Sequence, residues 1–416
     1  MAWFDRASHA CVLLAAASFA CGSSSTGAGP TTTGGVDGGD SPDASGTDGA
    51  PSNAGDGGAT DSASGADGGG CGATSLLDRP ADPSAKGPWP VGAKSTTING
   101  LVTEIWYPAA VGSESGKPQV SYDIRKDLPP DQAAKISDAD NPLQPCDCFR
   151  DLPLDTTHGP YPLVVFVHGT ASFKTQNLDN AVHWASRGFV VMAANHPGLS
   201  IASFLGAGGT QDLPGNVKAE IAAIAMASGD LASFSGHVDA TRIGLVGHSA
   251  GGNGVATMDV PGAAVVIPLS ANASPVGGSV VSTLFVGGTA DGVVSYASVQ
   301  GGYANDATRS HKRLVGVAGA GHTGVTSLCG IKNAAGNSIV DVAKASGVLS
   351  GVLGGFADTL FDCAKNTTPQ ADVIPIVNFA TSAVLEETLQ CEGHIGAKLD
   401  GIQGAYPKVQ EYQHAP

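Results

Sequence analysis

Short, continuous apolar runs recur along the second part of the chain and alternate with segments of helical periodicity. Most of these runs have the character that a strand needs when both faces of its sheet are covered. The alternation predicts an α/β fold with a mostly parallel central sheet and helices on both faces. The predicted strands cover residues 101–107, 163–168, 189–194, 242–247, 263–269, 283–287 and 313–317.

The helical segments lie between and after these strands, and no internal repeat is visible. Residues 73–416 are long enough to enclose one hydrophobic core, so we expect a single α/β domain there. The predicted helices cover residues 177–187, 217–232, 251–258 and 294–303, with two more near 339–353 and 376–390.

The amino terminus carries a different signal. Arg6 precedes an apolar segment at 11–20, which has the length of a signal-peptide core and is too short to cross a bilayer. The sequence Ser-Phe-Ala-Cys-Gly at 18–22 resembles the lipobox of bacterial lipoproteins. Residues 1–21 are therefore predicted to direct export, with Cys21 as the lipid anchor of a cell-envelope lipoprotein at the outer membrane or cell surface. Cleavage by the ordinary signal peptidase, followed by secretion, is the alternative.

Residues 22–72 are predicted to be a disordered linker. Positions 22–70 hold 16 Gly and 7 Asp with no Lys, Arg, Glu or aromatic residue, so this stretch cannot bury a core. The spaced Asp residues could instead bind calcium, but no Glu or rigid loop supports that interpretation. The whole chain has a net charge of −16, which excludes nucleic acid as the obvious partner.

Six cysteines follow Cys21, and an even number in an exported chain favours disulfides. Fifteen pairings are open in principle. A metal site is the weaker interpretation, because the Cys-Asp-Cys sequence at 146–148 lacks the usual ligand spacing and a nearby His. The six are Cys71, Cys146, Cys148, Cys329, Cys363 and Cys391.

The strongest chemical motif is Gly-His-Ser-Ala-Gly at 247–251, which joins a predicted buried strand to a predicted helix. This context is typical of a nucleophile elbow, in which a sharp turn exposes the serine at the carboxyl edge of the sheet. Gly247 and Gly251 lack side chains, so the strand and helix can pass closely. The motif predicts Ser249 as a nucleophile.

A serine nucleophile needs a base and an acid, which in this fold follow it in the order Ser, Asp, His. Asp291 comes just after the strand at 283–287, and His322 follows the strand at 313–317 through small residues. Asp291 could also be a simple turn residue, because Gly292 follows it. We predict that Ser249, Asp291 and His322 form a catalytic triad.

The oxyanion of such a reaction needs two preorganised N–H donors. The amide of Ala250, directly after the nucleophile, is one candidate. The second is the amide of Thr170, in the turn after the strand at 163–168. His168 and Gly169 are interpreted as structural residues that hold this turn against the elbow.

Further runs extend the pattern: GPWPVG at 87–92, EIWYPA at 104–109, YPLVVFVHG at 161–169, ASRGFVV at 185–191 and HPG at 196–198. With the elbow, they resemble bacterial α/β-hydrolases similar to platelet-activating-factor acetylhydrolase, in a superfamily with chlorophyllases, dienelactone-hydrolase-like esterases and cutinase-like polyester hydrolases. The resemblance covers nearly all of residues 85–390. It implies an α/β-hydrolase fold, the triad and oxyanion residues named above, and a disulfide between Cys329 and Cys363.

The expected activity is hydrolysis of a carboxylic ester, with a small-molecule or polymeric substrate and no cofactor or metal. Lipids, phospholipid-type acyl groups and polyesters all remain open, as does the oligomeric state. The alternative is a catalytically silent surface lipoprotein that uses a hydrolase scaffold for binding. Two long segments, 121–154 and 200–216, are expected to flank the cleft as lids or to be ordinary solvent loops.

Overall fold

The computed structural model describes residues 75–209, 211–306 and 311–415. The predicted signal segment, Cys21, the linker and Cys71 lie outside the described residues. No helix within the described ranges combines the length and apolar character needed to cross a membrane.

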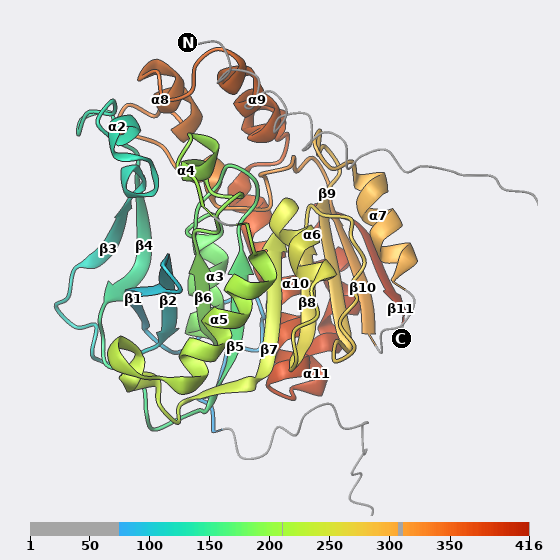
Figure 1. Ribbon diagram of the computed structural model, residues 1–416. Coiled ribbons are helices and arrows are strands. Elements are labelled where there is room, and N and C mark those ends of the chain that lie inside the picture. Colours follow the sequence, from blue (N-terminus) through green and yellow to red (C-terminus); the bar gives the residue numbers. More distant parts are fainter. Residues whose placement is uncertain (1–74, 210, 307–310, 416) are drawn as a thin grey trace, which may run out of the picture. The chain divides into compact units, whose positions relative to one another are not determined.

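The described chain is built around one eleven-stranded sheet (Figure 1). Its strand order is β11-β10-β9-β8-β7-β5-β6-β2-β1-β4-β3. The six strands from β6 to β10 in this order are mutually parallel, and β2 and β11 flank them in the antiparallel sense. The strands are β1 (Val91–Ile98), β2 (Leu101–Pro108), β3 (Gln119–Asp123), β4 (Leu143–Arg150), β5 (Tyr161–Val167), β6 (Val190–Ala194), β7 (Val238–His248), β8 (Ala263–Leu269), β9 (Ser282–Gly288), β10 (His311–Val317) and β11 (Val409–Ala415).

Helices cover both faces of the sheet. On one face α3 (Leu178–Ser186) and α10 (Gln370–Leu389) pack over a core that includes Val164 and Phe166. On the other, α5 (Leu213–Met226) and α6 (Ala250–Thr257) pack over Leu163 and Val165, and α7 (Tyr296–Asn305) covers β9 and β10. Neighbouring β5 residues thus point to opposite cores, which is why this strand reads as one apolar run. The predicted α/β fold is confirmed.

Several strands and helices differ from prediction. Strands β1, β3, β4 and β11 were not expected, because residues in them alternate between buried and exposed or lie half-buried. The helix expected at 339–353 is wrong: α8 (Ile339–Ala345) and α9 (Val352–Leu360) are separate, since Gly347 and Gly351 have left-handed backbone angles between them. The helix expected at 217–232 ends at Met226, where Ala227 has a φ of 41°.

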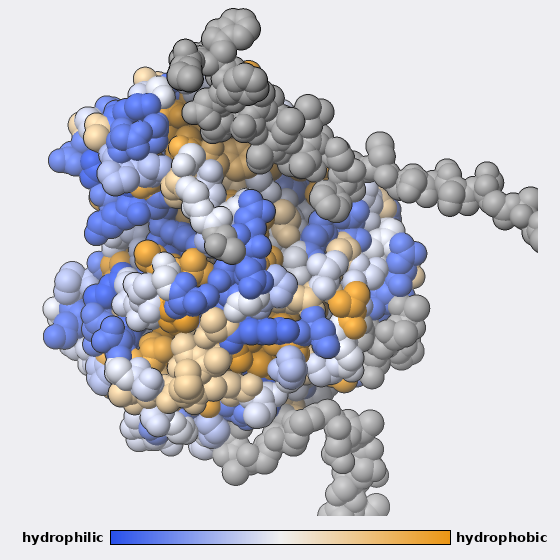
Figure 2. Space-filling view, in the orientation of Figure 1, coloured by the Kyte–Doolittle hydropathy of each residue, from blue (hydrophilic) through white to orange (hydrophobic). Residues whose placement is uncertain are grey.

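A cap lies over one end of the sheet (Figure 1). We define it as η2 (Ile124–Asp127), α2 (Pro130–Ala133), α4 (Ile201–Phe204), α8 and α9. Its outer surface over α2 is largely hydrophilic (Figure 2). Its inner side chains form two apolar clusters, so both long segments expected to flank the cleft pack into it. The residues of these clusters include Ile124, Ile136, Ala171, Phe173, Ile201, Leu328, Val342, Leu349 and Leu360.

Candidate active site

Ser249 occupies a sharp turn between β7 and α6. Its backbone has φ 54° and ψ −122°, a conformation that residues with a side chain rarely adopt. A Cβ on Gly251 would overlap the carbonyl oxygens of Val167 and His168, and one on Gly247 would overlap the Gly251 backbone. Glycine at both positions therefore allows the tight packing that holds the turn. Ser249 is only 6% exposed.

The structure brings Ser249, His322 and Asp291 into one hydrogen-bonded chain. His322 Nε2 lies 2.9 Å from Ser249 Oγ, and His322 Nδ1 lies 2.9 Å from Asp291 Oδ2. The other carboxylate oxygen, Oδ1, accepts hydrogen bonds of 2.8 Å from the amides of Val293 and Val294. With the proton on Nδ1 donated to Asp291, Nε2 can accept the serine proton. All three side chains are buried.

The turn that carries Thr170 passes directly beside the serine. A Cβ on Gly169 would lie 3.2 Å from Ser249 Cβ, so the two backbones are in close approach. The amides of Thr170 and Ala250 donate no hydrogen bond to another described residue. Both N–H groups are therefore available to a ligand oxygen at the serine.

A relay of side chains that sequence reasoning missed ties this turn to the histidine loop. The amide of Gly169 donates to Gln176 Oε1 at 2.7 Å, and Gln176 Nε2 donates to His248 Nδ1 at 2.8 Å. His248 Nε2 in turn donates to the His322 carbonyl at 2.9 Å. Burial lowers the pKa of His248 to about 3, so the ring stays neutral and keeps both roles. Gln176 belongs to no recognisable sequence motif, and its contact with His248 joins residues that lie far apart in the sequence.

His168 supports the same turn from the other side. Its Nδ1 donates to the Gly169 carbonyl at 2.9 Å, and its Nε2 accepts from the His196 amide at 3.1 Å. Burial lowers the pKa of His168 to about 4. The neutral imidazole is therefore a structural bridge between β5 and the segment after β6, whereas the sequence interpretation had it hold the turn against the elbow.

Polar contacts also join the cap to the turn that carries Thr170. Lys174 forms a buried ion pair with Asp127 of η2. Asn195 donates to Asp127 at 2.8 Å and accepts from the Lys174 amide at 2.8 Å. This group links the first cap segment to the chain that follows Thr170, so movement of the cap would disturb the turn.

An apolar cavity of about 60 Å³ lies beneath the cap. Ala171, directly after Thr170, lines it, as does Phe361, directly before a carboxylate that contacts the His322 loop. The cavity therefore adjoins two segments that position the site. Other lining residues are Ile124, Leu128, Ile201 and Val342.

Two disulfides are described in full. Cys329 and Cys363 are bonded, with an S–S distance of 2.00 Å, which is the pair that the resemblance implied. Cys146 is bonded to Cys148, two residues away. Cys391 is also disulfide-bonded. Within the described residues no group of three or more His, Cys, Asp or Glu side chains is arranged to hold a metal ion.

The sheet order, the elbow and the hydrogen-bonded Ser-His-Asp chain together have the architecture of an α/β-hydrolase. Residues 142–205 match the model of the family described as platelet-activating factor acetylhydrolase, isoform II. The matched segment runs from β4 to α4 and contains Thr170. No curated protein matches the chain. The family match supports similarity to hydrolases that act on esters.

Proposed function

We propose that this protein is a serine esterase that hydrolyses carboxylic esters through an acyl-enzyme. The observation that carries the proposal is the hydrogen-bonded chain from Ser249 Oγ through His322 to Asp291, at 2.9 Å for each step, on a strained strand-to-helix turn. The family match over residues 142–205 supports the same class of reaction.

The first half of the reaction forms the acyl-enzyme. Ser249 Oγ attacks the ester carbonyl carbon while His322 Nε2 takes the hydroxyl proton. The carbonyl oxygen becomes an oxyanion that the amides of Thr170 and Ala250 stabilise. The C–O bond to the alcohol then breaks, and His322 returns its proton to the leaving oxygen.

The second half releases the acid. Water takes the place of the alcohol, and its oxygen attacks the acyl carbon while His322 removes one of its protons. The tetrahedral species then breaks its bond to Ser249 Oγ, which takes the proton from His322, and the carboxylic acid is released. Asp291 accepts the hydrogen bond from His322 Nδ1 throughout, and its negative charge favours the imidazolium form of His322. The apolar interior of the cap suits esters with a hydrocarbon portion, such as lipids, phospholipid-type substrates or polyesters.

The proposal is tested by hydrolysis of p-nitrophenyl esters of increasing acyl length by the purified protein, followed by phospholipids and polyesters. We expect turnover that a serine-reactive phosphonate abolishes, and loss of turnover by orders of magnitude in His322→Ala. His394→Ala is the matched control, because that side chain is 71% exposed and lies outside the site. Ester turnover that survives both Ser249→Ala and His322→Ala contradicts the proposal.

Export and lipidation at Cys21 are a separate proposal, supported by the sequence of residues 1–22. Intact-mass measurement of protein from the membrane fraction is expected to give a chain that begins at Cys21 and carries lipid. An unmodified chain cut elsewhere contradicts the lipid anchor and leaves the esterase proposal untouched.

A further inference from the structure

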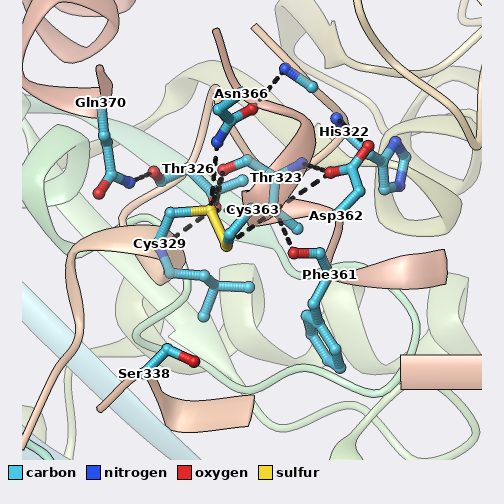
Figure 3. Close-up of a disulfide and its surroundings, with 12 residues drawn as sticks. His322, Thr323, Thr326, Cys329, Ser338, Phe361, Asp362, Cys363, Asn366 and Gln370 are labelled. Atoms are coloured by element: carbon cyan, nitrogen blue, oxygen red, sulfur yellow. Dashed lines mark hydrogen bonds between the residues drawn. A yellow bond between two sulfur atoms is a disulfide. The ribbon is translucent and has the colours of Figure 1, made fainter. Parts of the chain in front are cut away.

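A second carboxylate, Asp362, binds the backbone of the loop that carries His322. It lies between α9 and η5 (Cys363–Lys365) and is 3% exposed. Its Oδ2 accepts from the His322 amide at 3.0 Å, and its Oδ1 accepts from the Thr323 amide at 3.3 Å. Figure 3 shows this carboxylate directed at the histidine loop, beside the Cys329–Cys363 disulfide.

Asn366 continues the same set of contacts. Its Oδ1 accepts from the Gly321 amide at 2.6 Å, so three consecutive amides, 321 to 323, are bound from one short segment (Figure 3). A Cβ on Gly321 would lie 2.7 Å from Asn366 Oδ1 and 3.0 Å from both carboxylate oxygens of Asp362. Glycine at 321 is thus required by this packing.

Asp362 also reaches the loop of the triad acid. The amide of Gly292, directly after Asp291, lies 3.5 Å from Asp362 Oδ2. One carboxylate therefore contacts the backbone on both sides of the His322–Asp291 hydrogen bond. Displacing it would alter the relative position of the two loops.

Among the described residues, no Lys, Arg or His side chain forms an ion pair with the Asp362 carboxylate. Its partners are backbone amides and the Thr323 hydroxyl at 3.5 Å. The titratable groups around His322 and Asp362 include Asp291, His248, whose ring centroid lies 4.7 Å from that of His322, and Lys365, whose Nζ lies beside Gly292. A negative charge close to an imidazole favours the protonated form of the ring.

We propose that Asp362 is a positioning residue for His322, which fixes the histidine loop through its amides and stabilises the imidazolium through its negative charge. This inference rests on the proposed esterase function. Asp291 acts on the ring directly, and Asp362 acts on it through the backbone and through space.

The test compares Asp362→Asn with Asp155→Asn as the matched control. Asp155 is also a buried carboxylate that accepts from a backbone amide, that of Thr157 at 2.9 Å, but it contacts none of the triad loops. We expect Asp362→Asn to lower kcat about 10- to 100-fold, as loss of charge-assisted hydrogen bonds implies, with KM changed less than about twofold. Asp155→Asn is expected to lower the melting temperature and leave kcat unchanged.

The pH profile separates the charge from a purely structural role. Removing the charge makes protonation of the histidine less favourable, so the acidic limb of kcat/KM is expected to move to lower pH in Asp362→Asn. Asp362→Glu, which keeps the charge, is expected to leave the limb in place while kcat falls. Asn366→Ala, which loses the Gly321 contact without a charge change, is expected to behave in the same way.

Several results would overturn the proposal. Asp362→Asn could keep the kcat of the wild type, or its acidic limb could coincide with that of Asp362→Glu. If Asp362→Asn does not fold, Asp362→Glu decides: lower kcat with an unmoved limb supports the proposal, and wild-type kcat refutes it. A wild-type protein that hydrolyses no ester and is not labelled by a phosphonate is a different result, which contradicts the esterase function itself.

Discussion

Replacing Cys329 and Cys363 together by serine is expected to destabilise the protein and impair catalysis. The bond closes a loop of 34 residues. In the chain-entropy model, closing a loop of that length restricts the unfolded chain by about 13 cal/mol/K, or about 4 kcal/mol at 25 °C. Serine is the suitable replacement, because Thr323 Oγ1 lies 3.2 Å from Cys329 Sγ and can hydrogen-bond to a hydroxyl there.

The expected shift in melting temperature follows from the size of the domain. Unfolding about 340 residues changes the entropy by about 0.7 kcal/mol/K, so a loss of about 4 kcal/mol lowers the melting temperature by about 5 °C. Turnover is expected to fall as well, because Cys363 directly follows Asp362, which binds the His322 amide. Scanning calorimetry and ester hydrolysis on the same preparation measure both effects.

The other fully described disulfide gives the control. Cys146 and Cys148 are only two residues apart, so the same model assigns that bond about 1 kcal/mol, or about 2 °C. The double serine variant at 146 and 148 is expected to retain normal turnover. Melting of the two double variants within a degree of each other, or full activity of the variant at 329 and 363, would contradict this prediction.

Three further substitutions test the packing at the serine turn, the hydrogen bonds of Gln176 and the pH dependence of stability. Gly251→Ala is expected to cost several kcal/mol of stability, because the new methyl group would overlap the Val167 and His168 carbonyls; soluble protein with an unchanged melting temperature contradicts this. Gln176→Ala is expected to lower kcat about 10- to 100-fold with little change in KM, because it frees the Gly169 amide and His248; equal kcat for wild type and variant would show that the relay is not needed. Burial raises the pKa of Glu220 to about 8 from 4.5, so its neutral form is favoured in the folded state; its contribution to stability is present below about pH 4.5 and is lost as pH rises toward 8. Glu220→Gln is therefore expected to weaken the decline in melting temperature between pH 5 and pH 8, and an unchanged slope by calorimetry would contradict it.

The central strands of the sheet could be predicted from the sequence because each of them is a short run of consecutive apolar residues. Strands β5 to β10 are buried on both faces, so each is a short apolar run bounded by polar or small residues. The edge strands and the cap could not be predicted in the same way. Strand β4, for example, alternates buried and exposed residues, and the helix that packs against it, α3, follows it only after β5.

Some residues of the candidate site could likewise be predicted from the sequence, and others could not. Ser249, Asp291 and His322 each follow a predicted strand, so their order and spacing mark them in the sequence. Asp362 and Gln176 carry no such mark, because each acts through contacts with backbone that lies distant in sequence or within an irregular turn. The sequence indicates Asp362 only indirectly, through Gly321, because the absence of a side chain at 321 leaves room for the carboxylate.

The most direct test of the central claim is covalent labelling with a fluorophosphonate, followed by peptide mass spectrometry. A serine activated by His322 Nε2 at 2.9 Å is expected to take up one phosphonyl group, on the peptide that contains Ser249. The rate is expected to fall by orders of magnitude in His322→Ala and to stay unchanged in His394→Ala. Absence of an adduct at Ser249 in the wild-type protein, or labelling at the wild-type rate in His322→Ala, would contradict the account.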